Sequence, residues 1–222
     1  MDPRISVNKL GEYMTATPAR RRQIVKDQKN RPAFKAARYR DARDAISSLI
    51  ASGTAGEARA RDFAEGLRRD PGGSDFAIQD RAHSAAAIDT FVEIRGAMKI
   101  DDLIAVSADA RCSDAVEMAG VRVVARPDAL LLDPRSLAVV GCVKLHFSKS
   151  QPLDEKGGNY VATAMQTHLE RNLSAPGLVL SSRCYVVDIA TRRIHTAPKA
   201  RKRRLGDLAA ACEEIKDRWE KL

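Results

Sequence analysis

The stretch that decides the fold is residues 126–149, which read RPDALLLDPRSLAVVGCVKLHFSK. It contains two apolar runs, 129–132 and 137–147, and the turn-forming sequence DPRS lies between them. From position 143 to position 147 every second side chain is apolar, which is typical of a strand that presents two different faces. The stretch therefore predicts two antiparallel strands joined by a hairpin.

Further helices and strands are expected on both sides of this hairpin. Apolar spacing of three and four residues, together with Pro and Gly breaks, predicts helices at residues 8–14, 19–29, 33–51, 55–68, 74–95, 159–173 and 205–222. Thr17 is the expected N-cap of one of them, and Ser74 or Asp75 is the expected N-cap of another. Short apolar runs predict strands at residues 103–106, 121–125, 183–189 and 194–197.

The order of these elements predicts an α/β fold of the α+β kind. From residue 74 onward the order is helix, three strands, helix, strand. We divide the chain into a basic helical region at 1–73, an α/β core at 74–198, and a basic run with a C-terminal helix at 199–222.

This order and two short motifs resemble the PD-(D/E)xK, or restriction-endonuclease-like, nuclease superfamily. The motifs are Arg126-Pro127-Asp128 and, on the next strand, Val140-Gly141-Cys142-Val143-Lys144. In this superfamily the Pro-Asp aspartate and the (D/E)xK acid hold Mg²⁺, and the lysine helps to activate water or to stabilise developing charge. The resemblance covers about half of the chain. It implies a restriction-endonuclease-like core that hydrolyses phosphodiester bonds, with Asp128 and Lys144 in the first and last motif positions.

The chain departs from the family pattern at Cys142, which stands where the family has Asp or Glu. A thiolate is a soft ligand and a poor choice for Mg²⁺, so either the second acid lies elsewhere or the metal site is lost. Glu93, on the helix before the strands, is the best replacement, and Asp89 is the reserve. Gln166 lies where many relatives place a glutamine. The resemblance thus implies catalytic roles for Asp128, Lys144, Glu93 and Gln166, with Asp128 and Glu93 as ligands of Mg²⁺ or Mn²⁺.

Each of these residues also has an ordinary structural interpretation. Asp128 can shape the entrance to its strand, and Lys144 can be a half-exposed strand residue. Glu93 and Gln166 can be polar residues of helix surfaces, while Cys142 is interpreted as a small buried hydrophobe.

Positive charge is concentrated in two segments of this chain of net charge +9. Residues 1–45 hold twelve Lys and Arg against five Asp and Glu, and residues 192–204 hold seven Lys and Arg and no acid. Phosphate backbones are the commonest partners of such segments, although a solvated basic surface is the alternative. The candidate nucleic-acid contacts are Arg20, Arg21, Arg22, Arg126, Lys149, Lys199, Arg201, Lys202 and Arg203.

The type of nucleic acid and the cellular compartment are indicated by composition. Aromatic residues make up 5% of the chain, so few stacking platforms are expected, which favours duplex or backbone binding over base stacking. DNA is expected as the partner ahead of RNA. No long apolar run or signal peptide is found, and the four Cys are scattered without zinc-site spacing. We therefore expect a cytoplasmic protein that does not enter the membrane.

Three classes of function remain open from the sequence. The first is a metal-dependent nuclease in which the second acid has moved. The second is a catalytically inactive nuclease fold that serves as a binding or assembly subunit with a protein partner, in phage-defence or mobile-element machinery. The third is a basic helical interaction protein in which the motif match is accidental.

Overall fold

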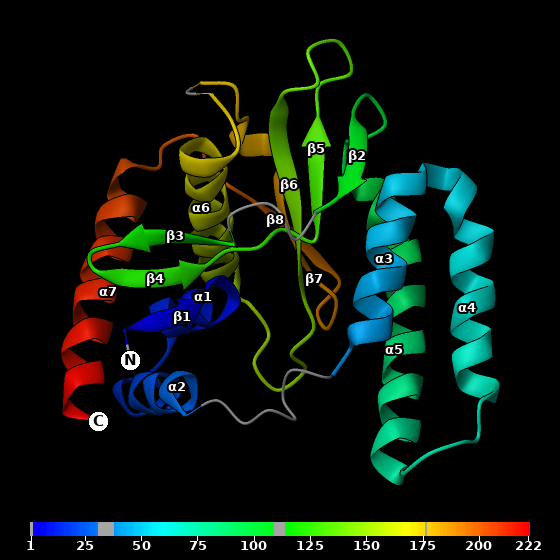
Figure 1. Ribbon diagram of the computed structural model, residues 1–222, viewed down its shortest axis with the longest axis horizontal. Coiled ribbons are helices and arrows are strands. Elements are labelled where there is room, and N and C mark those ends of the chain that lie inside the picture. Colours follow the sequence, from blue (N-terminus) through cyan, green and yellow to red (C-terminus); the bar gives the residue numbers. More distant parts are fainter. Residues whose placement is uncertain (1, 31–37, 109–113, 176) are drawn as a thin grey trace.

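The computed structural model describes residues 2–30, 38–108, 114–175 and 177–222. Within these ranges the chain is a mixed α/β protein of the α+β kind, as predicted. A five-stranded sheet lies at its centre, in the order β2-β5-β6-β7-β8 (Figure 1). Its strands are β2 (Ile104–Ser107), β5 (Ala129–Leu132), β6 (Val139–His146), β7 (Cys184–Asp188) and β8 (Arg193–Thr196). β6 and β7 are parallel, and the other neighbouring pairs are antiparallel.

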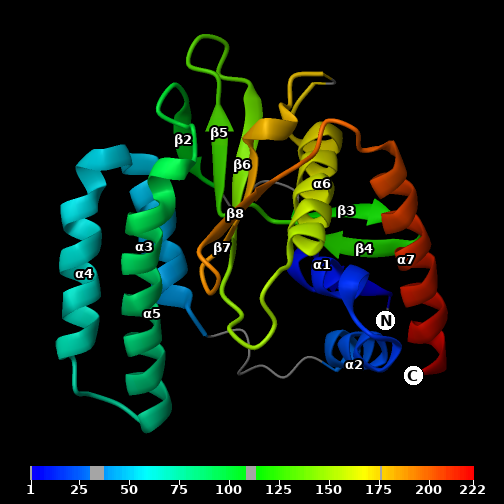
Figure 2. The same cartoon turned by 180° about the vertical axis from the view of Figure 1, so that it is seen from behind.

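Helices cover both faces of the five-stranded sheet (Figure 2). One face packs against α3 (Arg40–Ser52) and α5 (Asp75–Ile94), and α4 (Glu57–Arg69) lies outside them. The other face packs against α1 (Val7–Thr15) and α6 (Glu155–Asn172), followed outward by α2 (Pro18–Lys29) and α7 (Lys202–Lys221). Short 3-10 turns occur at Gly53–Gly56, Arg95–Ala97 and Ser181–Arg183. The sheet therefore separates two hydrophobic clusters.

The alternating side chains of β6 divide between these two clusters. Val143 and Leu145 are buried with α3 and α5, whereas Cys142 is buried with α1 and α6. The predicted hairpin turn is also present, because Asp133 Oδ1 accepts hydrogen bonds from the backbone N–H groups of Arg135 at 3.0 Å and Ser136 at 2.8 Å. The alternation and the turn predicted from residues 126–149 are thus confirmed.

The predicted order of elements is found from α5 onward within the five-stranded sheet only. α5 is followed by β2, β5 and β6, which form an antiparallel meander interrupted between β2 and β5 by two strands of another sheet, and then by α6, β7 and β8. The predicted N-caps are also present, since the side chain of Thr17 accepts from Arg20 N and that of Ser74 accepts from Ala77 N.

A second, smaller sheet was not predicted. It contains β1 (Arg4–Ser6), β3 (Ala115–Met118) and β4 (Val121–Val124), in the order β1-β4-β3. β3 and β4 form a hairpin through Ala119 and Gly120, whose φ angles of 46° and 76° suit a two-residue turn. β1 pairs with β4 in parallel, so this sheet joins two distant parts of the chain.

The predicted division into three segments does not correspond to separate cores. One hydrophobic cluster contains Ile5 from residues 1–73, Met165 from residues 74–198 and Trp219 from residues 199–222. Figure 1 shows the two termini on the same side of the molecule.

The helix predicted at 33–51 also needs correction. α3 begins at Arg40, because Tyr39 before it has a left-handed backbone with φ 59°, and residues 33–37 of the prediction lie outside the described ranges.

The close approach of α1 to α6 gives a testable prediction. A Cβ atom at Gly11 would lie 2.3 Å from Val161 Cγ2 and 3.0 Å from Gly157 O. We expect Gly11→Ala to lower the free energy of unfolding by about 1–3 kcal/mol, because overpacking outweighs the better helix propensity of Ala. Urea denaturation measures this change.

Gly66 in α4 provides the matched control, since nothing lies within 4 Å of a Cβ at that position. Gly66→Ala should stabilise the protein by about 0.5–1 kcal/mol. Equal effects of the two substitutions would contradict the close packing of α1 on α6.

Candidate functional site

Asp128 and Lys144 lie together at the start of β5. The backbone pairing of Ala129 with Val143 places Asp128 beside β6, on the face that also carries Lys144. Lys144 Nζ lies 2.9 Å from Asp128 Oδ2 and donates to Arg126 O at 2.8 Å. Asp128 retains 3% and Lys144 10% of side-chain exposure. The two motif residues predicted to act together therefore form a buried ion pair.

Both oxygens of Asp128 already have donors. Oδ2 accepts from Leu145 N at 2.8 Å as well as from Lys144, and Oδ1 accepts from Arg43 Nη1 of α3 at 2.5 Å. Burial alone would raise the pKa of Asp128, but the positive charges of Lys144 and Arg43 outweigh burial and lower this pKa below its ordinary value. Asp128 is therefore an ionised carboxylate held by two cations and one peptide N–H.

Cys142, at the position of the missing acid, is a core residue. Its side chain is fully buried beside Cys184, its register partner on β7. The contact with Cys184 and the burial raise the pKa of the Cys142 thiol well above its usual range. The side chain is thus a neutral thiol, as the interpretation of a small buried hydrophobe expects.

The arrangement does not fit the Mg²⁺ that the resemblance implies. An ammonium and a guanidinium group occupy the carboxylate oxygens of Asp128 that would bind the ion. Magnesium also prefers several oxygen ligands, whereas the neighbouring motif position holds a protonated thiol. In the described part of the chain, no three His, Cys, Asp or Glu side chains are grouped in a way that could hold a metal ion.

Glu93 does not lie beside Asp128. It lies on α5, which packs through Ile88, Phe91 and Val92 against the opposite face of the sheet. Its side chain is 50% exposed and pairs with Arg192 at 2.8 Å. The reserve candidate, Asp89, pairs with Arg68 of α4. The expectation of Glu93 as a metal ligand beside Asp128 is therefore corrected: the buried stripe of α5 turns Glu93 toward solvent.

Gln166 lies on α6, which covers the same sheet face as Lys144. It is 5% exposed, and its Nε2 donates to Glu170 at 3.1 Å. Its Oε1 is buried without a hydrogen-bond partner among the described residues. Gln166 is therefore a buried polar residue of the helix, and no hydrogen bond joins it to Asp128 or Lys144.

Asn8 of α1 belongs to the site and was not predicted. β5 has not yet begun opposite Leu145, so side chains replace the missing strand there. Leu145 N donates to Asp128, and Leu145 O accepts from Asn8 Nδ2 at 3.0 Å. One residue of β6 thus connects the Asp128 carboxylate to the start of α1.

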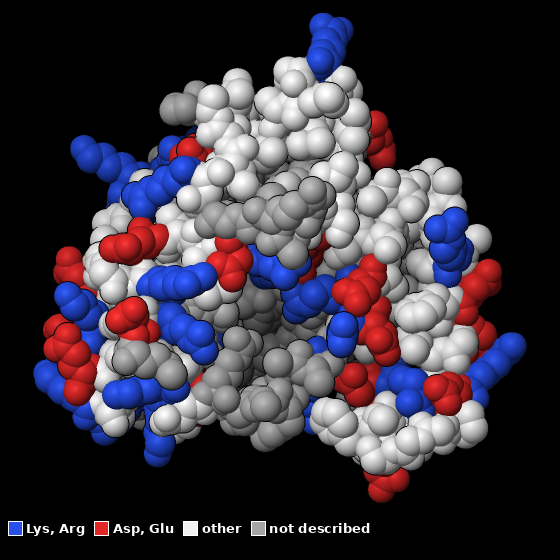
Figure 3. Space-filling view, viewed as in Figure 1, with Lys and Arg blue, Asp and Glu red and all other residues white. Residues whose placement is uncertain are grey.

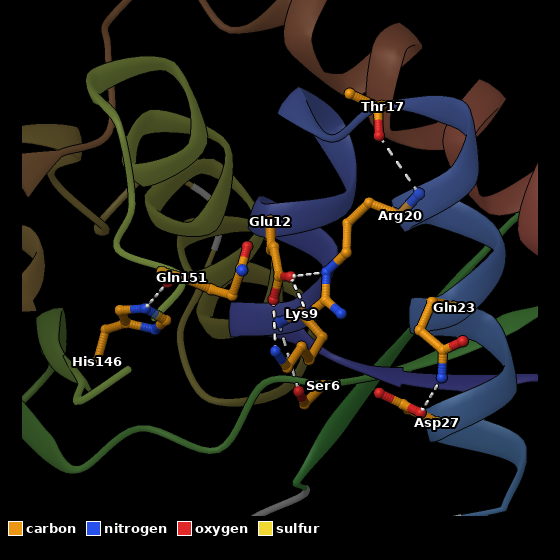
Figure 4. A network of polar contacts seen from close by, with 9 residues as sticks. All are labelled: Ser6, Lys9, Glu12, Thr17, Arg20, Gln23, Asp27, His146 and Gln151. Carbon is orange, nitrogen blue, oxygen red and sulfur yellow. Dashed lines mark hydrogen bonds and ion pairs between the residues drawn. The ribbon is translucent and has the colours of Figure 1, made fainter. Parts of the chain in front are cut away.

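Glu12, one helical turn after Asn8, is the second residue that was missed. Its side chain is 6% exposed and pairs with Lys9 and with Arg20, whose Nε donates at 2.7 Å. Figure 4 shows Glu12 between these two cations, with His146 of β6 nearby. The spacing of Asn8 and Glu12 by four residues, which puts both on one face of a helix, was the signal that could have revealed them.

His146 is neutral in this setting. Burial lowers the pKa of its imidazole, and Nε2 lies 2.9 Å from Gln151 O, so that nitrogen is assigned the proton. The positive charge of the cluster therefore comes from Lys9, Arg20, Arg43 and Lys144.

Two contacts link the site to helices on either side of it. Asp128 contacts α3 through Arg43, and the adjoining Leu145 contacts α1 through Asn8. Figure 3 shows a hollow on this face of the molecule, with Lys and Arg as well as Asp and Glu side chains around it. We call the set Asn8, Lys9, Glu12, Arg20, Arg43, Asp128 and Lys144 the Asp128 cluster.

The predicted nucleic-acid contacts fall into two groups. Arg20, Arg21 and Arg201 have internal partners, since they pair with Glu12, Glu214 and Glu170 respectively. The remaining six are exposed and available to a ligand: Arg22, Arg126, Lys149, Lys199, Lys202 and Arg203. Ion pairs within the protein therefore account for two of the three arginines at positions 20–22, and these two need no ligand.

No protein-family model and no curated protein sequence matches this chain. Among the helices of the described ranges, none has both the length and the hydropathy needed to span a membrane.

The ion pair of Asp128 and Lys144 can be tested with a double-mutant cycle. We expect Asp128→Asn and Lys144→Met each to lower the free energy of unfolding by about 3–5 kcal/mol, because each leaves its partner buried and unpaired. The double variant should be clearly less destabilised than the sum of the two. Chemical denaturation measures all four proteins.

The exposed pair of Glu93 and Arg192 is the matched control for this cycle. Its coupling energy, measured with Glu93→Gln and Arg192→Met, should stay below about 1 kcal/mol. Additive effects of the Asp128 and Lys144 substitutions would show that the buried pair is not formed.

Proposed function

We propose that this protein binds the phosphate backbone of nucleic acid, DNA in preference to RNA, at the hollow beside the Asp128 cluster. The observation that carries the proposal is the position of Arg43. Its guanidinium is anchored to the buried Asp128 by one nitrogen, yet its side chain remains 39% exposed. An arginine presents five N–H donors in a rigid fork that matches phosphate geometry. Arg43 is thus pre-oriented with donors left for an incoming phosphate.

Neighbouring cations extend this surface. Arg126 precedes Asp128 and is exposed, while its carbonyl is fixed by Lys144. Lys149 follows β6 and is also exposed. Together with Arg43 they supply exposed positive charge from segments that adjoin the Asp128 cluster, which favours backbone contacts through Coulomb attraction and counterion release.

The resemblance to PD-(D/E)xK nucleases supports a nucleic-acid ligand. The order helix, three strands, helix, strand and the contact of Asp128 with Lys144 agree with what that resemblance implies. Cys142 and the cations on Asp128 argue against metal-dependent hydrolysis. We therefore favour a nuclease-like fold that binds without cutting, acting in the cytoplasm as a binding or assembly subunit with a protein partner in a phage-defence or mobile-element system.

A metal-dependent nuclease is the second candidate function. The observation that favours it is the direct contact of Asp128 with Lys144, the two residues that match the motif. It would require Arg43 to leave Asp128 and a further acid to approach.

The proposal predicts salt-dependent binding of labelled duplex DNA, measured by fluorescence anisotropy. The double variant Arg126→Ala/Lys149→Ala should reduce the slope of log K against log salt by about 2, or about 1 for each lost phosphate contact. Both side chains are exposed, so the fold should be unaffected. Lys221→Ala, at the far end of α7, is the single-charge control and should change the slope by less than about 1.

Cleavage of plasmid, linear and single-stranded DNA and of RNA is measured in parallel with Mg²⁺ or Mn²⁺. We expect no cutting. Metal-dependent cutting that is lost in Asp128→Asn would instead establish the nuclease. Absence of binding to every nucleic acid by the folded wild-type protein would contradict both candidates.

A further inference from the structure

A second basic cavity lies between α6 and α7, which run side by side in Figure 2. Its volume is about 610 Å³, which is within the usual range for small-molecule sites. The charged and polar residues of its wall include Lys156, Tyr160, Arg203, Arg204, Asp207 and Glu214. None of its lining residues belongs to the Asp128 cluster, so the cavity is a separate place on the molecule.

The acids of the cavity wall already have partners. The Tyr160 hydroxyl donates to Asp207 Oδ2 at 2.6 Å. Glu214 accepts from Arg218 at 2.7 Å and from Arg21 at 3.2 Å. Glu214 is therefore neutralised by two arginines, whereas Asp207 is held by a neutral hydroxyl.

The cations Lys156, Arg203 and Arg204 are not compensated in this way. Across the described ranges, none of the three forms an ion pair, and Arg204 donates only to the backbone carbonyl of Ala200 at 3.2 Å. Lys156 and Arg203 are exposed. The cavity wall thus carries more positive than negative charge, because Arg21, Lys156, Arg203 and Arg204 stand against Asp207 and Glu214.

The first turn of α7 adds to this imbalance. It contains Lys202, Arg203 and Arg204 and no acid, and the N-cap residue Arg201 makes no side-chain capping bond. Cations at a helix N-terminus oppose the helix dipole, so local helix stability does not account for these residues. A bound anion would offset the repulsion.

We propose that the cavity between α6 and α7 binds the phosphate of a nucleotide, with Lys156, Arg203 and Arg204 as its ligands. The volume exceeds what a single phosphate needs, and Met14, Ala210 and Ala211 provide apolar wall for a sugar or base. The nucleotide is either free or a unit of a bound strand. In the second case the inference rests on the proposed function and adds a second phosphate contact to it.

The test compares two double variants by isothermal titration calorimetry with adenosine monophosphate and by anisotropy with a labelled oligonucleotide. Lys156→Ala/Arg203→Ala removes two exposed cavity cations. Lys216→Ala/Lys221→Ala removes two exposed cations of α7 that do not line the cavity. We expect the cavity variant to weaken binding of at least one ligand about tenfold or more, and the control variant to change it by less than about threefold.

The two ligands distinguish the source of the phosphate. Weaker binding of adenosine monophosphate alone indicates a free nucleotide, and weaker binding of the oligonucleotide indicates a strand. Equal behaviour of the cavity and control variants toward both ligands would overturn the inference.

The variant Arg126→Ala/Lys149→Ala separates this inference from the proposed function. If it alone weakens oligonucleotide binding, the cavity takes no part in strand binding and the Asp128 cluster remains the interface; the cavity is then a phosphate site only if its variant weakens binding of adenosine monophosphate. If only the cavity variant weakens oligonucleotide binding, the cavity is the phosphate site and the proposed interface at the Asp128 cluster is wrong.

Discussion

The carboxylate of Asp128 loses its water when β5 pairs with β6, and the surrounding structure replaces that water. Lys144, Arg43 and the N–H of Leu145 supply three donors to its two oxygens. A buried charge without such partners would cost several kcal/mol. The position of α3, which carries Arg43, is therefore coupled to the pairing of the two central strands.

The same constraint reaches the other side of the sheet. The side-chain amide of Asn8 in α1 donates a hydrogen bond to the carbonyl of Leu145, and the N–H of Leu145 donates one to Asp128. α1 in turn packs against α6 at Gly11, where its backbone lies too close to Val161 for a side chain. The two hydrophobic clusters are thus connected by polar contacts at one point of β6.

Local patterns predicted the central strands and several helix ends, because these depend on neighbouring residues. The turn at Asp133, the cap at Ser74 and the alternation around Lys144 could all be identified in short windows of sequence. The contact of Asp128 with Lys144 followed from strand geometry and the motif. Cys142 was correctly interpreted as a buried residue.

Features that depend on distant partners could not be predicted in this way. β1 has three residues and is defined by its pairing with β4, so no local periodicity marks it. Arg21 was interpreted as a ligand contact because its partner Glu214 is 193 residues away. Glu93 was chosen by its place on a helix, but the sequence did not indicate which sheet face that helix covers.

The pairing of the two ends of the chain has a consequence for biosynthesis. α2 is held by α7 through Arg21 with Glu214 and Lys29 with Trp219 O, contacts that span 193 and 190 residues. During translation the hydrophobic cluster that contains the apolar side chains of α1 and α2 is therefore incomplete until α7 has been synthesised. Such long-range contacts slow folding and leave apolar surface exposed meanwhile. The nascent N-terminal helices are thus the segment most in need of a chaperone until synthesis reaches α7.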